Sequence, residues 1–65
     1  MKVLVNDEEA DVADDLTVAE LLTQFGFPDN GIAVAVDWAV IPRSQWNTLL
    51  REGSRVEVVT AVQGG

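Results

Sequence analysis

Thr17-Val18-Ala19-Glu20-Leu21-Leu22-Thr23-Gln24-Phe25-Gly26 is the stretch that decides the fold, because it carries the strongest helix signal of the chain. Thr17 and Glu20 match the capping-box pattern, in which the hydroxyl and the carboxylate satisfy free amides of a first helical turn. Four apolar residues recur at i, i+3, i+4 and i+7, on one stripe of the helix: Val18, Leu21, Leu22 and Phe25. Gly26 and then Pro28 stop the helix. We therefore expect one main helix whose stripe faces a core.

The residues before this helix predict a hairpin of two short strands. Residues 2–6 favour a strand with Val3 and Val5 on one face. Asn6-Asp7-Glu8 supplies turn residues, and a second strand is expected near residues 9–13.

The residues after the helix predict two further strands and a short helix. Residues 32–36 form an apolar, β-prone run that follows a turn signal, so this strand should not be solvated on both faces. A short strand is expected at 38–41. Ser44 is a candidate N-cap for a short helix with three residues directed inward: Trp46, Leu49 and Leu50.

The last strand, residues 55–62, changes character along its length. Apolar and polar residues alternate at Val56, Glu57 and Val58, which predicts that one face of the strand is exposed to solvent. Beyond Val58 the strand is apolar apart from Thr60. Taken together, the element order indicates the α+β class and suggests a β-grasp fold. We expect a single domain over residues 1–62 and a flexible tail over 63–65.

Composition restricts the function. A chain of 65 residues with no Cys and no His must be stabilised by apolar packing, without disulfides or a structural metal. The net charge of -7 argues against nucleic acid and anionic membranes as partners. No apolar run is long enough for a signal peptide or a membrane span, so a cytoplasmic location is expected.

The residue types argue against an autonomous enzyme. A His base, a Cys nucleophile, a Tyr and a Gly-rich phosphate loop are all missing from the sequence. Paired carboxylates occur in Asp7-Glu8-Glu9 and Asp14-Asp15, but their neighbours are turn residues with nothing apolar to raise a pKa. We interpret both groups as solvated surface and expect no bound metal or cofactor.

The Gly64-Gly65 end is the one feature that points to chemistry. A tail without side chains can thread a narrow tunnel in a partner protein that any Cβ would obstruct. Since three extended residues reach only about 10 Å, the end of the last strand must dock near the mouth of that tunnel. We predict partner contacts from Gln63 and Gly64, and from Val59 and Ala61 on the strand face that points away from the core. The alternative is that this strand is covered on both faces by its own domain.

The chemistry expected at Gly65 needs a second protein. A terminal carboxylate, with a pKa of about 3.5, is ionised at neutral pH and must become an acyl-adenylate before sulfur can attack it. The four basic residues form no motif that would clamp ATP and its Mg²⁺, so a separate ATP-using enzyme is implied. Without Cys the chain cannot hold a persulfide, and any sulfur that it carries must sit on the carbonyl carbon of Gly65.

The whole chain resembles the thiamine-pathway sulfur carrier family, which is similar to ubiquitin in fold and to the small subunit of molybdopterin synthase in mechanism. The resemblance rests on four blocks: residues 3–7, residues 17–22, Ile41-Pro42-Arg43-Ser44-Gln45-Trp46, and residues 56–65. The last two are the more specific. Pro-Arg-Ser-Gln-Trp, with this length and this ending, looks like the thiazole-forming branch.

The resemblance implies that a ubiquitin-activating-type adenylyltransferase uses ATP on Gly65. Sulfur would then arrive from a cysteine-derived persulfide, and thiazole synthase would accept it. Gly64 would line the threading channel. The resemblance also implies that the first and last strands lie side by side in parallel within a mixed sheet. Asp7 stands where a Gly is common, which leaves the type of the first turn open.

Several alternatives stay open at this point. The molybdopterin synthase small subunit shares fold, tail and thiocarboxylate, but it serves another acceptor and is usually longer. A ubiquitin-like modifier would be joined through Gly65 to lysines of target proteins, and an inert tail would do nothing. We interpret Trp46 as core and Arg43 as a solvated charge, with a partner contact as the lesser alternative for Arg43. A monomer is expected, because the acidic surface repels itself.

Overall fold

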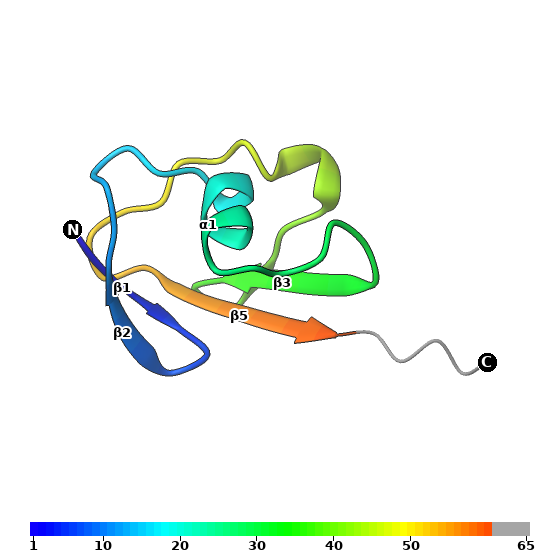
Figure 1. Ribbon diagram of the computed structural model, residues 1–65, viewed down its shortest axis with the longest axis horizontal. Coiled ribbons are helices and arrows are strands. Elements are labelled where there is room, and N and C mark those ends of the chain that lie inside the picture. Colours follow the sequence, from blue (N-terminus) through cyan, green and yellow to red (C-terminus); the bar gives the residue numbers. More distant parts are fainter. Residues whose placement is uncertain (61–65) are drawn as a thin grey trace.

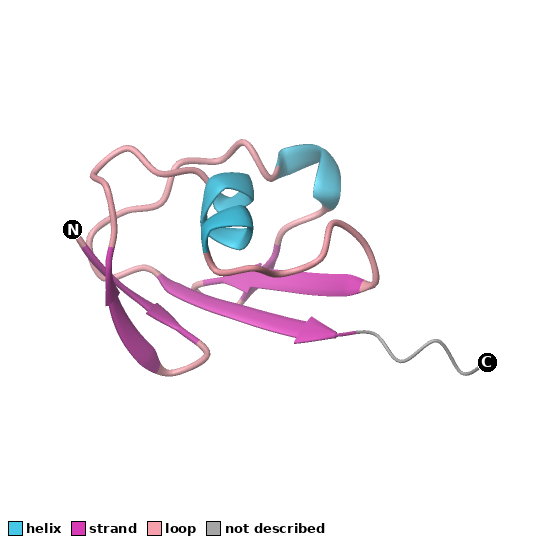
Figure 2. Cartoon of the chain, in the orientation of Figure 1, coloured by secondary structure: helices cyan, strands magenta, loops and turns pink. Residues whose placement is uncertain are grey.

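The structure is a computed structural model that describes residues 1–60, and the segment from Ala61 to Gly65 lies outside the described residues. Within residues 1–60 it contains five strands, one α-helix and one short 3-10 helix, η1 (Figures 1 and 2). Their bounds are β1 Lys2–Val5, β2 Glu8–Asp11, α1 Val18–Gln24, β3 Ile32–Val36, β4 Ala39–Val40, η1 Arg43–Gln45 and β5 Arg55–Thr60. The α+β prediction and the predicted order of elements are confirmed.

The five strands form one mixed sheet in the order β2-β1-β5-β3-β4. β1 and β5 lie side by side in parallel at its centre, with Leu4 opposite Arg55 and Val5 opposite Val56 (Figure 1). The other neighbouring pairs are antiparallel. The parallel pairing that the resemblance implied is therefore confirmed, and it places the last described strand inside the sheet.

α1 lies across one face of the sheet (Figure 1). The capping box is confirmed: the Thr17 hydroxyl accepts from the Glu20 N–H at 3.1 Å, and the Glu20 carboxylate accepts from the Thr17 N–H at 2.9 Å. The helix and the inner faces of β1, β3 and β5 enclose most of the core, which consists of Val3, Val5, Val12, Leu16, Val18, Leu21, Leu22, Val34, Leu50, Val56 and Val58.

Phe25 is not part of that core, contrary to the predicted stripe. Its side chain is 42% exposed, because α1 ends at Gln24 and Phe25 is already the C-cap. Gly26 then adopts a positive φ, a left-handed conformation in which glycine carries no Cβ penalty. This reversal brings the Phe27 N–H to the carbonyl of Leu22 at 2.9 Å, and Phe27 packs against the core instead.

The second predicted helix is present at its place in the order but is much shorter than predicted. Only a single 3-10 turn forms, preceded by Pro42 with no side-chain cap, so Ser44 is not the N-cap. Beyond it the backbone pairs with the entry of α1: the Val18 N–H bonds the Thr48 carbonyl at 3.0 Å, and the Leu50 N–H bonds the Leu16 carbonyl at 2.9 Å. A helix that continued through Leu50 would have used the Leu50 N–H internally, in a bond to the carbonyl four residues earlier. Leu50 is buried as predicted, whereas Leu49 is 59% exposed.

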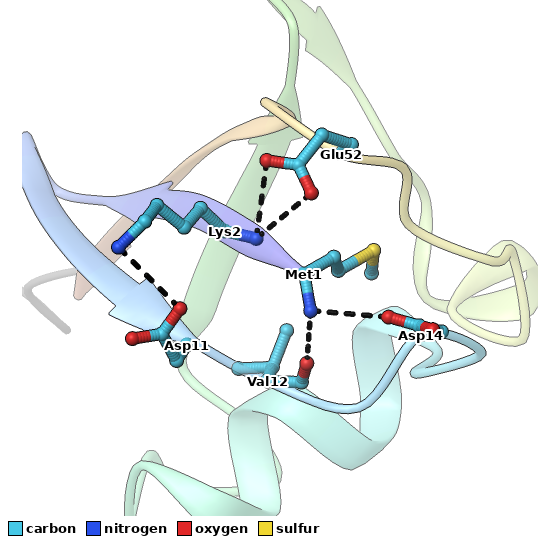
Figure 3. Close-up of polar contacts among 6 residues, drawn as sticks. All are labelled: Met1, Lys2, Asp11, Val12, Asp14 and Glu52. Atoms are coloured by element: carbon cyan, nitrogen blue, oxygen red, sulfur yellow. Dashed lines mark hydrogen bonds and ion pairs between the residues drawn. The ribbon is translucent and has the colours of Figure 1, made fainter.

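The end of the sheet around Met1 is held by polar contacts with acidic side chains (Figure 3). The amino group of Met1 donates to the Val12 carbonyl at 2.7 Å and to the Asp14 carboxylate at 3.1 Å. Glu52 accepts from the Lys2 backbone N–H at 3.2 Å, and the Lys2 ammonium lies 3.6 Å from Asp11. These contacts fix the start of β1, so several of the acids have a structural use.

Candidate functional site

The described part of the candidate site is the end of β5, which leads toward Gly65. Gln63, Gly64, Gly65 and Ala61, which the sequence singled out, lie outside the described residues. Val58 is buried and Val59 is 62% exposed, so the predicted alternation of faces is confirmed up to this point. The alternative in which this strand is covered on both faces does not hold at Val59.

The sheet register places small or apolar residues of β3 and β4 beside Val59 on the face opposite α1, together with Glu57, which is two residues before Val59 on β5. Val59 is paired with Ala33, and Ala35, two residues further along β3, is paired with Val40. Paired residues of antiparallel strands point to the same side of a sheet. Val40 is 75% exposed. We call this surface the outer patch and define it as Ala33, Ala35, Trp38, Val40 and Val59.

Trp38 lies in the turn between β3 and β4, beside Arg55 at the start of β5, and forms the end of the outer patch that is distant from Val59. Asp37 and Trp38 both have positive φ values, in the left-handed region that bulky residues rarely adopt. The turn is held to β5, because the Asp37 N–H bonds the Arg55 carbonyl at 2.8 Å and the Asp37 carboxylate accepts from the Arg55 N–H at 3.0 Å. The Trp38 side chain is nevertheless 76% exposed. Its exposure on a strained turn is not explained by core packing and is typical of a contact residue.

The charges beside the outer patch are paired. The Arg55 guanidinium carbon lies 5.1 Å from the centre of the Trp38 ring, which is a cation–π distance. The same guanidinium contacts the Asp7 carboxylate at 2.6 Å and lies 3.9 Å from Glu57. A partner would therefore meet an apolar centre bordered by a neutralised cation and two acids. This composition fits an apolar partner surface with basic groups at its rim.

The acidic groups do not form a catalytic or metal-binding arrangement within residues 1–60. No cluster of three or more His, Cys, Asp or Glu side chains there is placed to hold a metal ion. Asp7, Glu8, Glu9, Asp14 and Asp15 are all exposed, as predicted. Glu20 is a separate case: the hydrogen bond from the Thr17 backbone, followed by that from the Thr17 hydroxyl, lowers its pKa below 4.5. This contact caps α1 and has no chemical role.

Two other predictions concern the segment around η1. Trp46 is half-buried against the core and donates its Nε1–H to the Ile41 carbonyl at 3.1 Å, which agrees with its interpretation as a core residue. Arg43 is exposed, and its guanidinium carbon lies 5.5 Å from the centre of the Trp46 ring. A partner contact by Arg43 stays a prediction.

Sequence reasoning found Val59 but missed Trp38 and Val40. Both belong to a segment that was predicted as a short strand, and nothing local indicates which side that strand shows to solvent. The neighbours of Val59 come from pairings between residues far apart in the chain. The adjacent Asp37-Trp38 pair, between two apolar runs, was the one available turn signal.

Among the described residues, no helix is long and apolar enough to cross a membrane.

The sequence of this chain matches one protein family and individual members of known function. The model of the ThiS family matches residues 2–65. The sulfur carrier protein ThiS of Escherichia coli is 32% identical over 66 residues, and the match covers the whole of both chains. A thiazole synthase from Paramagnetospirillum magneticum is 29% identical over 66 residues, which cover all of this chain and 20% of that protein.

Solved structures agree with these matches. The crystal structure of the thiamine biosynthesis protein ThiS from Geobacter metallireducens superposes with a TM-score of 0.86 at 28% identity, over the full length of both chains. The solution structure of a thiamine biosynthesis protein from the same organism gives a TM-score of 0.80, with 88% of that chain covered.

Proposed function

The chain belongs to the ThiS family of sulfur carriers in thiamine biosynthesis, and from this premise we propose that the sulfur is carried on Gly65 as a thiocarboxylate. The single observation behind this proposal is that the family match extends through the Gly-Gly end of a chain that contains no Cys. Without a thiol, the terminal carbonyl is the remaining place for covalently held sulfur.

We propose that a separate adenylyltransferase activates Gly65 with ATP and Mg²⁺. A carboxylate oxygen attacks the α-phosphorus of ATP, pyrophosphate leaves, and the resulting acyl-adenylate is an electrophile that the free carboxylate is not. A donor persulfide then attacks the acyl carbon and displaces AMP. A thiol cleaves the acyl disulfide so formed, which leaves the thiocarboxylate on Gly65 and a disulfide on the donor side.

The outer patch is the proposed docking surface for the activating enzyme. Residues 61–65 follow the end of β5. An extended chain of that length spans about 17 Å. The enzyme must therefore bind close to the end of β5, where Val59 lies. Val40 is on the same face of the sheet, and Trp38 adds an exposed aromatic ring beside Arg55 at the start of β5. Exposed aromatic and aliphatic residues mark interaction sites.

Thiazole synthase is the proposed sulfur acceptor. The support is that a protein named thiazole synthase includes a stretch similar to this entire chain, so that carrier-like and synthase sequences occur in one polypeptide there. Because activation consumes ATP, we place the reaction in the cytoplasm. We also propose that the carrier is a monomer, which binds the two partner enzymes one after the other.

The first test is the intact mass of the protein isolated from cells that are able to make thiamine but are starved of it. We expect a fraction heavier by one oxygen-to-sulfur exchange, located in the C-terminal peptide. Deletion of Gly65 should abolish that fraction and growth without thiamine. A ladder of higher-mass protein conjugates would instead support a ubiquitin-like modifier. If the wild-type protein carries a thiocarboxylate but the strain with the Gly65 deletion still grows without thiamine, the sulfur has another acceptor, such as that of molybdopterin synthase.

A further inference from the structure

Asn6 makes a contact with β5 that the sequence pattern did not reveal. It follows the last residue of β1, and its backbone N–H bonds the Val56 carbonyl at 2.9 Å. Its side-chain amide then reaches the next residue on the same edge of β5: the oxygen accepts from the Val58 N–H at 2.8 Å, and the nitrogen donates to the Val58 carbonyl at 3.3 Å.

This contact extends the sheet beyond the end of β1. The parallel pairing of β1 with β5 stops at Val5 and Val56, whereas β5 continues to Thr60. In a continued parallel pairing, a backbone carbonyl would have accepted from the Val58 N–H, and the N–H of a residue two positions further along would have donated to the Val58 carbonyl. The Asn6 amide presents the same two groups, so it acts as a substitute for a backbone partner. Val58 lies opposite Val34 of β3, and both of its backbone polar groups point to the other side, where Asn6 bonds them.

We propose that Asn6 is a positioning residue for the carrier reaction, because its amide fixes the end of β5 from which the chain runs on to Gly65. The inference rests on the proposed function. We call this pair of hydrogen bonds between the Asn6 amide and Val58 the clamp. Val58 is adjacent to Val59 of the outer patch, so the clamp holds the part of β5 that bears the docking surface. A misplacement of about 1 Å at a reacting group can reduce a rate about 100-fold.

The turn itself does not require this side chain. Asn6 and Asp7 occupy the two central positions of the hairpin, and both have positive φ values, which identify a type I′ turn. Such a turn favours Asn, Asp or Gly at its first central position and Gly at its second, so Gly is accepted at both. The two side chains differ in what they contact, since Asp7 pairs with Arg55 and Asn6 pairs with the backbone of Val58. The neighbours are therefore a matched pair for an experiment.

The test compares Asn6→Gly with Asp7→Gly in the full chain. Both changes suit the turn, but only the first removes the clamp. We expect Asn6→Gly to speed hydrogen exchange of the Val58 amide about tenfold or more relative to the Val34 amide, because the bond to Asn6 protects it. Asp7→Gly should leave that ratio within about twofold of the wild type. Asn6→Asp should fall between them, since a carboxylate can accept from the Val58 N–H but repels the carbonyl.

The second readout is ATP–pyrophosphate exchange by the adenylyltransferase of the same organism, with the carrier as varied substrate. The outer patch is intact in Asn6→Gly, so KM should stay within about twofold while kcat falls about tenfold, because fewer docked chains present Gly65 correctly. Loss of stability alone would not give this split at a temperature where both variants are folded.

Two results would overturn the proposal. An unchanged Val58 exchange ratio in Asn6→Gly would show that the clamp does not hold β5, and a kcat equal to that of the wild type would show that the clamp does not matter for activation. Absence of pyrophosphate exchange with the wild-type carrier is a different outcome. It would refute the proposed activation of Gly65, and the positioning role with it.

Discussion

Glu20 is an exposed residue whose protonation is nevertheless linked to folding. Its carboxylate accepts hydrogen bonds from the Thr17 N–H and hydroxyl, and the first of these chiefly lowers its pKa below 4.5. Because the folded pKa lies below the unfolded one, the stabilisation is present above about pH 4.5 and is lost as the pH falls through the folded pKa. We expect Glu20→Gln to destabilise the protein at pH 7 and to match the wild type once Glu20 is protonated.

The measurement is the urea midpoint of both proteins between about pH 7 and pH 3, since the linkage is confined to this range. The difference between the two midpoints at each pH cancels the contributions of the other acids, which both proteins share. A difference that stays constant over the whole range would mean that the amide of Gln loses a contact unrelated to the charge of Glu20.

At the scale of single residues, the sequence predicted what depends on near neighbours. Thr17 and Glu20 are three positions apart, and their reciprocal bonds were expected and are present. The roles of Asn6 and Trp38 were not expected, because both depend on contacts with β5, which lies far along the chain from either residue. A turn signal indicates that the chain reverses, but it does not say what the side chains of the turn will touch.

Helix α1 contributes to stability through the residues that face the sheet, and the corrected end of its stripe can be tested. Leu21 is fully buried, whereas Phe25 is 42% exposed. We expect Leu21→Ala to lower the free energy of unfolding by about 3 kcal/mol, and Phe25→Ala by less than about 1 kcal/mol. Urea denaturation of the two variants gives the comparison. Equal losses would mean that Phe25 belongs to the core after all.

The outer patch makes a prediction for docking at the scale of one sheet face. Removing an apolar side chain from the centre of an interface costs about 1–2 kcal/mol or more, which is roughly a tenfold loss of affinity. We expect Val59→Ser to raise the KM for the carrier about tenfold in adenylation. Leu49→Ser is the matched control, because Leu49 is 59% exposed against 62% for Val59 but pairs with Thr17 at the entry of α1. A similar rise in both variants would argue against a specific docking surface.

The elements that sequence reasoning found are those with strong local patterns. β1, α1, β3 and β5 all have the expected faces within the described residues. The second helix failed because Thr48 and Leu50 bond residues far earlier in the chain, and an apolar spacing of three and four cannot distinguish a helix from such an extended segment. For the candidate site, the strand that bears Val59 could be predicted, but the strands that surround it could not.

At the scale of the molecule, the parallel placement of β1 beside β5 came from the resemblance and not from spacing. Nothing in either strand identifies its partner, since both are short runs rich in Val and are separated by most of the domain. This pairing is what brings Asn6 to Val58. The contact between the hairpin turn and β5, the strand that precedes Gly65 in the sequence, therefore depends on the overall topology of the sheet.

The net charge of -7 sets two electrostatic effects against each other. Ion pairs such as Lys2–Asp11 and Arg55–Asp7 stabilise the fold. Exposed pairs contribute only about 0–1 kcal/mol each, and repulsion among the remaining acids opposes folding. Added salt distinguishes the attraction within ion pairs from the long-range repulsion, because the screening length falls from about 30 Å at an ionic strength of 0.01 M to about 8 Å at 0.15 M. The screening length at 0.15 M is shorter than the 11.3 Å radius of gyration of the protein, so the added salt weakens repulsion between acids on opposite sides of the molecule.

We therefore expect the urea midpoint to rise when NaCl is increased from about 0.01 M to about 0.15 M, because repulsion over long distances is screened more than the short contacts within ion pairs. The double variant Glu9→Gln, Asp15→Asn tests the cause. It changes the net charge from -7 to -5 (two acids removed) at exposed positions, so its midpoint should be higher at low salt and should rise less with NaCl. A wild-type midpoint that falls with NaCl would show instead that the ion pairs around Arg55 and Lys2 outweigh the repulsion. The proposed docking surface would then depend on salt through its own Arg55 contacts.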